Sequence, residues 1–322
     1  MLMVRLRGNH RWLAFAAILL TIALLAALRQ TDWTQPAGEP FKVTLLQGNI
    51  PQDAKWQSEY KLSTLNMYAD MTREHWDSRL IVWPETAVTV YYHQVRDSHF
   101  APLEAEARSH GADLLMGLPV SDQQTPHHYY NALAGLGRTP GFYFKRHRVP
   151  FGEYLPLRPV FGWVLEILDI PMADFSAGPD RQPPIVAAGY PLAASICFED
   201  IFSHEARAAL PEAAYLVNVT NDAWFGDSMA PHQHVQMARM RAIESGRYMA
   251  RASNSGITAI IGPKGEVLAR APMFVKTTLT GSIRPMQGRT PYVLWGDAAV
   301  FALVLTVLGM AIWLSRRGKG FL

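Results

Sequence analysis

Two long apolar runs without a charged residue, one near each end of the chain, restrict what these 322 residues can form. Residues 12–28 and 298–314 are each just long enough for a short membrane-spanning helix. Aromatic side chains typical of a membrane interface stand beside both runs: Trp12, Trp33, Tyr292, Trp295 and Trp313. We therefore expect transmembrane helices at residues 12–29 and 292–314.

Basic tails outside both runs predict the orientation of the chain. Residues 1–11 and 315–322 contain six lysines and arginines and no acidic residue. The positive-inside rule then places both tails in the cytoplasm and the segment between the runs across the membrane. A cleaved signal peptide is the alternative for the first run, and a buried core helix is the alternative for the second. No small-residue cleavage site follows the first run, and a basic cluster directly follows the second.

The charge of the middle segment excludes one class of partner. The whole chain has a formal charge of +3, from 30 basic and 27 acidic residues. Without the tails, 24 basic residues face 27 acidic ones, which leaves a slightly acidic segment. Nucleic-acid-binding domains carry a basic face, so we expect no nucleic-acid partner.

Short apolar segments alternate with helical patterns between the two runs. Residues 30–40 contain Pro36, Gly38 and Pro40 and read as a linker. Strands are expected at residues 41–47, 80–83, 113–120, 129–136, 142–144, 185–198 and 215–219, with a hairpin over 256–269. Helices are expected at residues 55–76, 103–110 and 232–247. This order predicts an α/β fold for residues 41–291, in which helices cover a sandwich of sheets.

Cys197 is the single cysteine of the chain, so it can form no internal disulfide. Packing as a small buried hydrophobe is one interpretation of such a residue. Two other segments favour reactivity, because Trp83-Pro84-Glu85 supplies a carboxylate and Lys145 supplies a cation. A thiol, a base and a fixed positive charge are the groups that an acyl-transfer site needs.

These three segments resemble the Glu-Lys-Cys triad of the nitrilase, or carbon–nitrogen hydrolase, superfamily. The sequence is most similar to the apolipoprotein N-acyltransferase branch. The resemblance rests on the triad in order and on further segments at residues 47–51, 55–56, 149–156, 221–226, 236–241 and 253–259. It implies an α-β-β-α sandwich, no cofactor and no metal.

The resemblance also implies a reaction in the bacterial inner membrane, with the catalytic domain on the periplasmic side. An acyl chain would pass from a phospholipid, through a thioester on Cys197, to the α-amino group of a diacylglyceryl-modified apolipoprotein. Glu85 would act as general base, and Lys145 with the N–H of Phe198 would stabilise the oxyanion. We expect the cation of Lys145 to lower the pKa of the thiol.

Several other residues are expected to support this site. Glu153 would orient Lys145 or Glu85, and Glu199 would support the turn at the cysteine. Trp56 resembles a family tryptophan near the acyl path, and ordinary core packing is its alternative. Pocket-rim residues are expected at Asn221, Asp222 and Trp224, although this segment also makes a sound turn. The histidine pairs 127–128 and 232/234 lack a third ligand nearby, which disfavours a metal site.

Three further interpretations remain open at this stage. The apolar segment 156–175 suits either a packed helix or an arm that dips into the lipid interface. The family usually has more membrane helices before the first run, so we expect a chain shortened at its N-terminus. The alternatives to a transferase are a membrane-tethered amidase with the same triad and an inactive scaffold.

Overall fold

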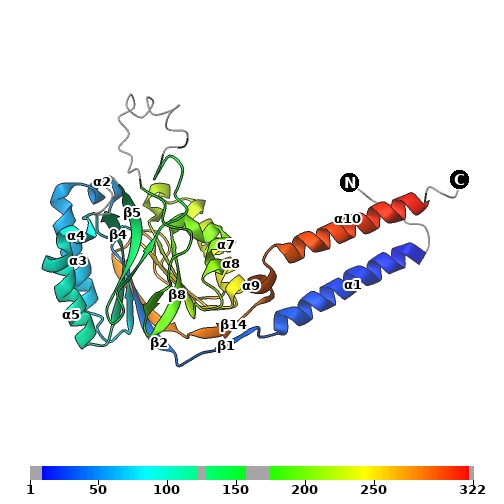
Figure 1. The fold of residues 1–322 in the computed structure, drawn as a ribbon, viewed down its shortest axis with the longest axis horizontal. Coiled ribbons are helices and arrows are strands. Elements are labelled where there is room, and N and C mark those ends of the chain that lie inside the picture. Colours follow the sequence, from blue (N-terminus) through cyan, green and yellow to red (C-terminus); the bar gives the residue numbers. More distant parts are fainter. Residues whose placement is uncertain (1–8, 122–127, 155, 157–174, 319–322) are drawn as a thin grey trace.

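The computed structural model describes residues 9–121, 128–154, 156 and 175–318, which form two packed sheets with helices on their outer faces (Figure 1). Within these ranges each sheet has six strands, in the orders β13-β2-β3-β4-β5-β6 and β12-β11-β10-β9-β8-β7. The first sheet contains β2 (Phe41–Gln47), β3 (Leu80–Val82), β4 (Asp113–Ser121), β5 (Tyr129–Leu136), β6 (Gly141–Phe144) and β13 (Thr277–Ile283). The second contains β7 (Ile185–Ala187), β8 (Tyr190–Ile196), β9 (Tyr215–Thr220), β10 (Met249–Ser253), β11 (Ala259–Ile261) and β12 (Val267–Arg270).

The centre of each sheet is parallel. Strands β2, β3 and β4 run in one direction, as do β8, β9 and β10. Every residue of β9 is buried, as expected for a parallel strand covered on both faces. Parallel neighbours end at the same edge of a sheet, so residues that follow β3, β8 and β9 are candidates for a common site.

Three apolar clusters hold the layers together. The largest lies between the sheets, where Val43 and Leu115 of one sheet face Ile196 and Val217 of the other. Helices α3 (Ser58–Arg73), α4 (Tyr92–Val95) and α5 (Ala101–Ser109) pack on the outer face of the first sheet. Helix α8 (Met229–Ser245) covers the outer face of the second. The predicted α-β-β-α sandwich is therefore confirmed.

Helix α8 begins and ends where local chemistry favours it. The Ser228 side chain accepts a hydrogen bond from the backbone N–H of Ala230, which caps the N-terminus. Gly246 ends the helix with a positive φ of 63°, a conformation that glycine adopts without a steric penalty. These two signals fix the position of α8. Its residue His234 contacts the backbone carbonyl of Cys197.

Short elements occupy several loops around the sandwich. They are α2 (Gln52–Lys55), the π-helix η1 (Arg96–Phe100), the 3₁₀ helices η2 (Cys197–Ile201) and η3 (Asp222–Phe225), and the helices α7 (Ser203–Ala208) and α9 (Pro291–Trp295). The predicted linker at residues 30–40 also contains a strand, β1 (Thr34–Pro36), which pairs antiparallel with β14 (Met286–Gly288). The strand was not expected in this segment, because its backbone hydrogen bonds are satisfied by a distant partner.

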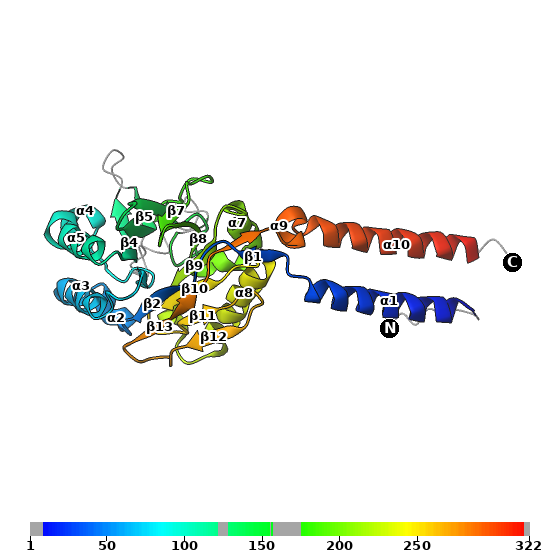
Figure 2. The same cartoon turned by 90° about the horizontal axis from the view of Figure 1, so that it is seen from below.

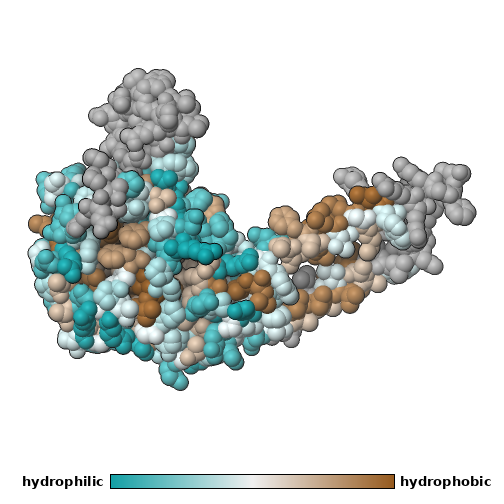
Figure 3. Space-filling model, in the orientation of Figure 1, coloured by the Kyte–Doolittle hydropathy of each residue, from teal (hydrophilic) through white to brown (hydrophobic). Residues whose placement is uncertain are grey.

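Two helices extend away from the sandwich side by side (Figures 1 and 2). They are α1 (Asn9–Gln30) and α10 (Ala298–Gly318), at the predicted apolar runs. The second begins at Ala298 instead of residue 292, because α9 and Gly296 precede it. Both expose apolar side chains along their length (Figure 3). In the part of the chain that the structure describes, no helix is long and apolar enough to cross a membrane. The apolar segment at residues 156–175 lies outside the described residues apart from its two ends.

Candidate active site

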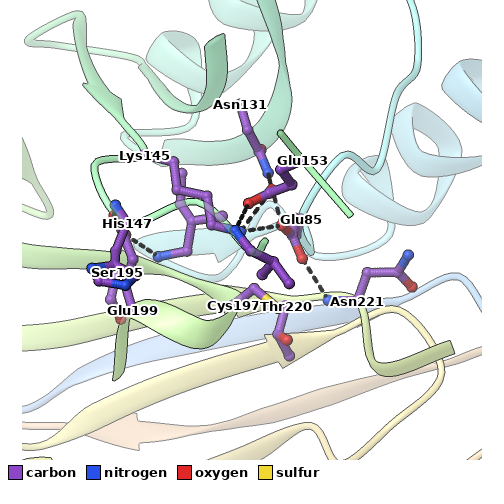
Figure 4. A network of polar contacts seen from close by, with 12 residues as sticks. Glu85, Asn131, Lys145, His147, Glu153, Ser195, Cys197, Glu199, Thr220 and Asn221 are labelled. Carbon is purple, nitrogen blue, oxygen red and sulfur yellow. Dashed lines mark hydrogen bonds and ion pairs between the residues drawn. The ribbon is translucent and has the colours of Figure 1, made fainter. Parts of the chain in front are cut away.

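Four strand ends converge on the three residues of the predicted triad (Figure 4). Glu85 follows β3, Lys145 directly follows β6, and Cys197 directly follows β8. Asn221, which follows β9 of the second sheet, donates its backbone N–H to a carboxylate oxygen of Glu85 in the first. The site therefore lies where the carboxyl ends of the parallel strands of both sheets meet.

The Glu85 carboxylate is buried and both of its oxygens accept hydrogen bonds. Oε1 accepts from Lys145 Nζ at 3.2 Å and from Asn131 Nδ2 at 2.8 Å. Oε2 accepts from the backbone N–H of Asn221 at 2.9 Å. These donors fix the orientation of the carboxylate.

Lys145 lies between two carboxylates. Its Nζ is 3.2 Å from Glu85 Oε1 and 2.8 Å from Glu153 Oε1, and its side chain is buried. Burial lowers the pKa of this ammonium, but Glu85 and Glu153 more than offset that effect and raise the pKa well above its usual value. Glu153 is itself fixed by Asn131 and by the backbone N–H of Val149. Lys145 is thus a permanent cation at this site.

Cys197 occupies a strained turn from strand to 3₁₀ helix. Its φ is +54°, in the left-handed region that non-glycine residues rarely adopt. Two side chains donate to its backbone carbonyl, Asn218 at 3.3 Å and His234 Nε2 at 3.1 Å. Such a turn presents the side chain above the end of the sheet, as nucleophile turns do in other hydrolytic folds.

The pKa of the Cys197 thiol lies above its usual value. Burial and the neighbouring Glu85 raise its pKa, and Lys145 lowers it by less than those two effects raise it. The contribution of Lys145 has the predicted sign, but burial and Glu85 outweigh it. A thiol that is protonated at rest needs an adjacent base to remove its proton.

Glu199 connects the cysteine turn to the lysine strand. Its buried carboxylate accepts hydrogen bonds from the backbone N–H groups of Ile196, Arg146 and His147 and from the hydroxyl of Tyr143. Burial raises its pKa to about 7, and Lys145 opposes the shift. Its four donors lie on both sides of the site, so Glu199 sets the position of Cys197 relative to Lys145.

A buried charge cluster lies below the cysteine turn. Arg251 donates to Asp200 at 3.1 Å and to Asp222 at 3.3 Å, and it also donates to Asn218. His234 bridges the same two carboxylates at 2.9 Å each. Two cations and two carboxylates make the cluster neutral when His234 is protonated. Its hydrogen bonds to Asp200 and Asp222 and to the Cys197 carbonyl give His234 a structural role within the described residues.

The remaining predicted residues are exposed and lie next in sequence to residues of the site. Trp56 follows the buried Lys55, and Phe198 stacks edge-on against Phe202. Trp224 is 71% exposed on η3, just after Asn221.

Four residues of the site were not predicted from the sequence: Lys55, Asn131, Asn218 and Arg251. A polar residue inside an apolar strand, such as Asn218 in β9, is the signal that marks the last three.

Gly117 of β4 allows the loop with Glu85 to approach the sheet. A Cβ atom built on Gly117 would lie 2.3 Å from the Pro84 carbonyl oxygen and 2.7 Å from Glu85 Cα. Both distances are far below van der Waals contact, so only glycine leaves room for this backbone. The position of Glu85 therefore depends on a neighbouring strand as well as on its own loop.

Comparisons with known proteins identify relatives of this chain. The family model for carbon-nitrogen hydrolases matches residues 42–292. An apolipoprotein N-acyltransferase of Methylococcus capsulatus is 59% identical over 97% of this chain, and one of Nitrosomonas europaea is 46% identical over 97%. The chain spans 61% and 63% of the lengths of these two relatives.

Solved structures share the fold at low sequence identity. A carbon-nitrogen hydrolase from Helicobacter pylori aligns with a TM-score of 0.57 and 17% identity, covering 76% of this chain and 89% of that one. An amidase from Nesterenkonia, with an acetamide moiety added to its active-site cysteine, aligns with a TM-score of 0.55 and 18% identity, covering 83% and 98%. The family model, which matches most of the sandwich, is the decisive comparison, and the chain belongs to the carbon–nitrogen hydrolase family.

Proposed function

We propose that this chain carries the catalytic domain of an apolipoprotein N-acyltransferase. The acyl donor would be a membrane phospholipid, and the acceptor would be the α-amino group of an N-terminal diacylglyceryl-cysteine. The observation that carries the proposal is the convergence of Glu85, Lys145 and Cys197 in a chain 59% identical to a relative of that name. The nitrilase-type sandwich and the exposed apolar helices support it.

In the first half-reaction Glu85 takes the proton of the Cys197 thiol, and the sulfur attacks the ester carbonyl of the phospholipid. Lys145 stabilises the resulting oxyanion together with the N–H of Phe198. An ammonium has three donors, and contacts with Glu85 and Glu153 use two of those on Lys145. The tetrahedral intermediate then collapses to a thioester, and Glu85 returns the proton to the departing lysophospholipid oxygen.

In the second half-reaction the amine of the apolipoprotein attacks the thioester carbonyl. Glu85 accepts a proton from the amine, and the same donors stabilise the second oxyanion. The carbon–sulfur bond breaks, the amide product leaves, and the thiolate regains its proton from Glu85. One carboxylate thus serves both halves, which fits a side chain with both oxygens held in place.

Large apolar side chains near the site suit an acyl substrate. Trp56, Phe198, Trp224, Phe225 and Met229 are all exposed or at the edge of exposure. Three of them lie on or beside η3, which follows the Asn221 that contacts Glu85. Exposed apolar groups gathered at a polar site typically mark binding of an amphipathic ligand.

An acyl-transfer assay tests the function. We expect purified full chain, mixed with fluorescent phospholipid vesicles and a synthetic diacylglyceryl-cysteine peptide, to yield acylated peptide and lysophospholipid. A control peptide with an acetylated α-amine should remain unmodified, because it lacks the nucleophile. Release of free fatty acid without acylated peptide would identify a hydrolase instead.

From the two apolar runs and the basic tails of the sequence, we also propose that the domain lies at the outer face of the bacterial inner membrane, with both termini in the cytoplasm. Exposed apolar residues on both helices support this, among them Leu20 and Phe301. A reporter inserted after Gly111, in an exposed turn, is expected to have its periplasmic activity. The same reporter at the C-terminus should have only cytoplasmic activity. Cytoplasmic activity at Gly111 would reverse the proposed orientation.

A further inference from the structure

A second buried lysine lies beside the triad and has no role in the mechanism above. Among the described residues, Lys55 and Lys145 are the lysines whose side chains are buried. Lys55 ends α2, and its Nζ donates to the backbone carbonyl of Glu85 at 3.2 Å. Thr89 donates its hydroxyl to the carbonyl of Lys55 at 2.9 Å. Lys55 is therefore joined at two points to the loop that carries Glu85.

The charges of Glu85, Glu153 and Lys145 do not balance without a second cation. Glu85 and Glu153 share the ammonium of Lys145, so these three groups alone carry one excess negative charge. An excess negative charge in a buried site opposes formation of a thiolate. The ammonium of Lys55 cancels it. Burial lowers the pKa of Lys55 to about 8, while Glu85 and Cys197 both act to raise it, so the amine is mostly charged at neutral pH.

The other ionisable groups near Cys197 do not supply this charge. Asp222 also raises the pKa of the thiol, but it belongs to the neutral cluster with Asp200, His234 and Arg251. Glu199 is an acid, and its carboxylate is held by backbone N–H groups and Tyr143. Among the described residues, the ammonium of Lys55 hydrogen-bonds to the Glu85 backbone carbonyl and forms no ion pair with a carboxylate.

We propose that Lys55 is a positioning residue that balances the charge of the Glu85–Glu153–Lys145 group and so stabilises the thiolate of Cys197 as it forms. Through its hydrogen bond to the Glu85 carbonyl, it also fixes the backbone of the general base. The inference deepens the proposed function by assigning a further residue to the same site. It applies equally to transferase and hydrolase chemistry, because both need the thiolate.

Alkylation of the single cysteine tests the inference directly. The rate of iodoacetamide addition to Cys197 in the full chain is measured by mass spectrometry between pH 6 and pH 10. We expect Lys55→Met to slow alkylation at pH 7 by about tenfold, equivalent to one unit in the thiol pKa. The difference from wild type should close above about pH 8, where Lys55 itself loses its charge.

Two further variants separate charge from packing. Lys55→Gln keeps an N–H donor for the Glu85 carbonyl but is neutral, so it should reproduce the slow alkylation of Lys55→Met. Lys264→Met, at an exposed lysine paired with Asp32, should alkylate like wild type. Wild-type rates in Lys55→Gln, or a loss that is equal at all pH values, would overturn the inference. If the variants alkylate as expected but the wild type transfers no acyl chain, the proposed function is refuted and the inference about Lys55 stands.

Discussion

A Cys197→Ala variant is expected to lose acyl transfer by on the order of 10⁶-fold, the loss seen when an enzyme's covalent nucleophile is removed. Without sulfur no thioester forms, and the amine would have to attack the phospholipid ester directly. The measurement is the mass of the intact protein after incubation with phospholipid vesicles. Wild type should gain one acyl group, and the variant should gain none.

The same variant should remain folded. The side chain loses only its sulfur atom, and the turn is held by hydrogen bonds to its backbone carbonyl. We expect the free energy of unfolding to change by no more than about 1 kcal/mol, the usual size of a small substitution. Ser203→Ala, a change of similar size six residues further on, should keep full activity. An acyl adduct on Cys197→Ala would show that another group is the nucleophile.

Several central strands were predictable because their local patterns are strong, but β10, fully buried in the second sheet, was not expected. Strand β5 was expected at its observed bounds, and β9 was misjudged only by its last residue, Thr220. Both are runs of mostly apolar residues bounded by turns, as strands covered by other layers usually are. Strand β13 was missed because most of its residues are only half-buried or exposed. Its position depends on pairing with β2, which lies more than 200 residues earlier in the chain.

The candidate site was predictable only in part, for a related reason. The triad residues follow recognisable segments, so each was found from its neighbours in sequence. Lys55 stood out only as part of the segment 55–56 and Arg251 only as a polar residue inside an apolar strand. Neither pattern assigns a role, and a charged residue is normally expected at the surface. Arg251 contacts Asp200, which is 51 positions earlier in the chain. Contacts of this kind arise from strand order, and only the folded sheet reveals them.

An Arg251→Met variant is expected to destabilise the fold by about 3–5 kcal/mol, the usual effect of breaking a buried ion pair from one side. Methionine has a similar length, so lost volume contributes little. The loss arises because Asp200 and Asp222, both fully buried, would keep only His234 as a cationic partner among the described residues. Urea unfolding of the full chain in detergent measures the effect. Acyl transfer should fall as well, because Asn218 and His234 anchor the Cys197 carbonyl.

The pH dependence of this destabilisation identifies its cause. Burial opposes ionisation of Asp222, but Arg251 and His234 outweigh it and lower the pKa to about 2. This carboxylate therefore stabilises wild type above the unfolded pKa of about 3.9, and that stability is lost as the pH falls toward 2. Without Arg251 the pKa of Asp222 should rise, so the two proteins should differ most above pH 4 and converge in acid. Arg270→Met, at an exposed position on β12, should stay within about 0.5 kcal/mol of wild type at every pH. A pH-independent loss in Arg251→Met would mean that packing, and not charge, holds the cysteine turn in place.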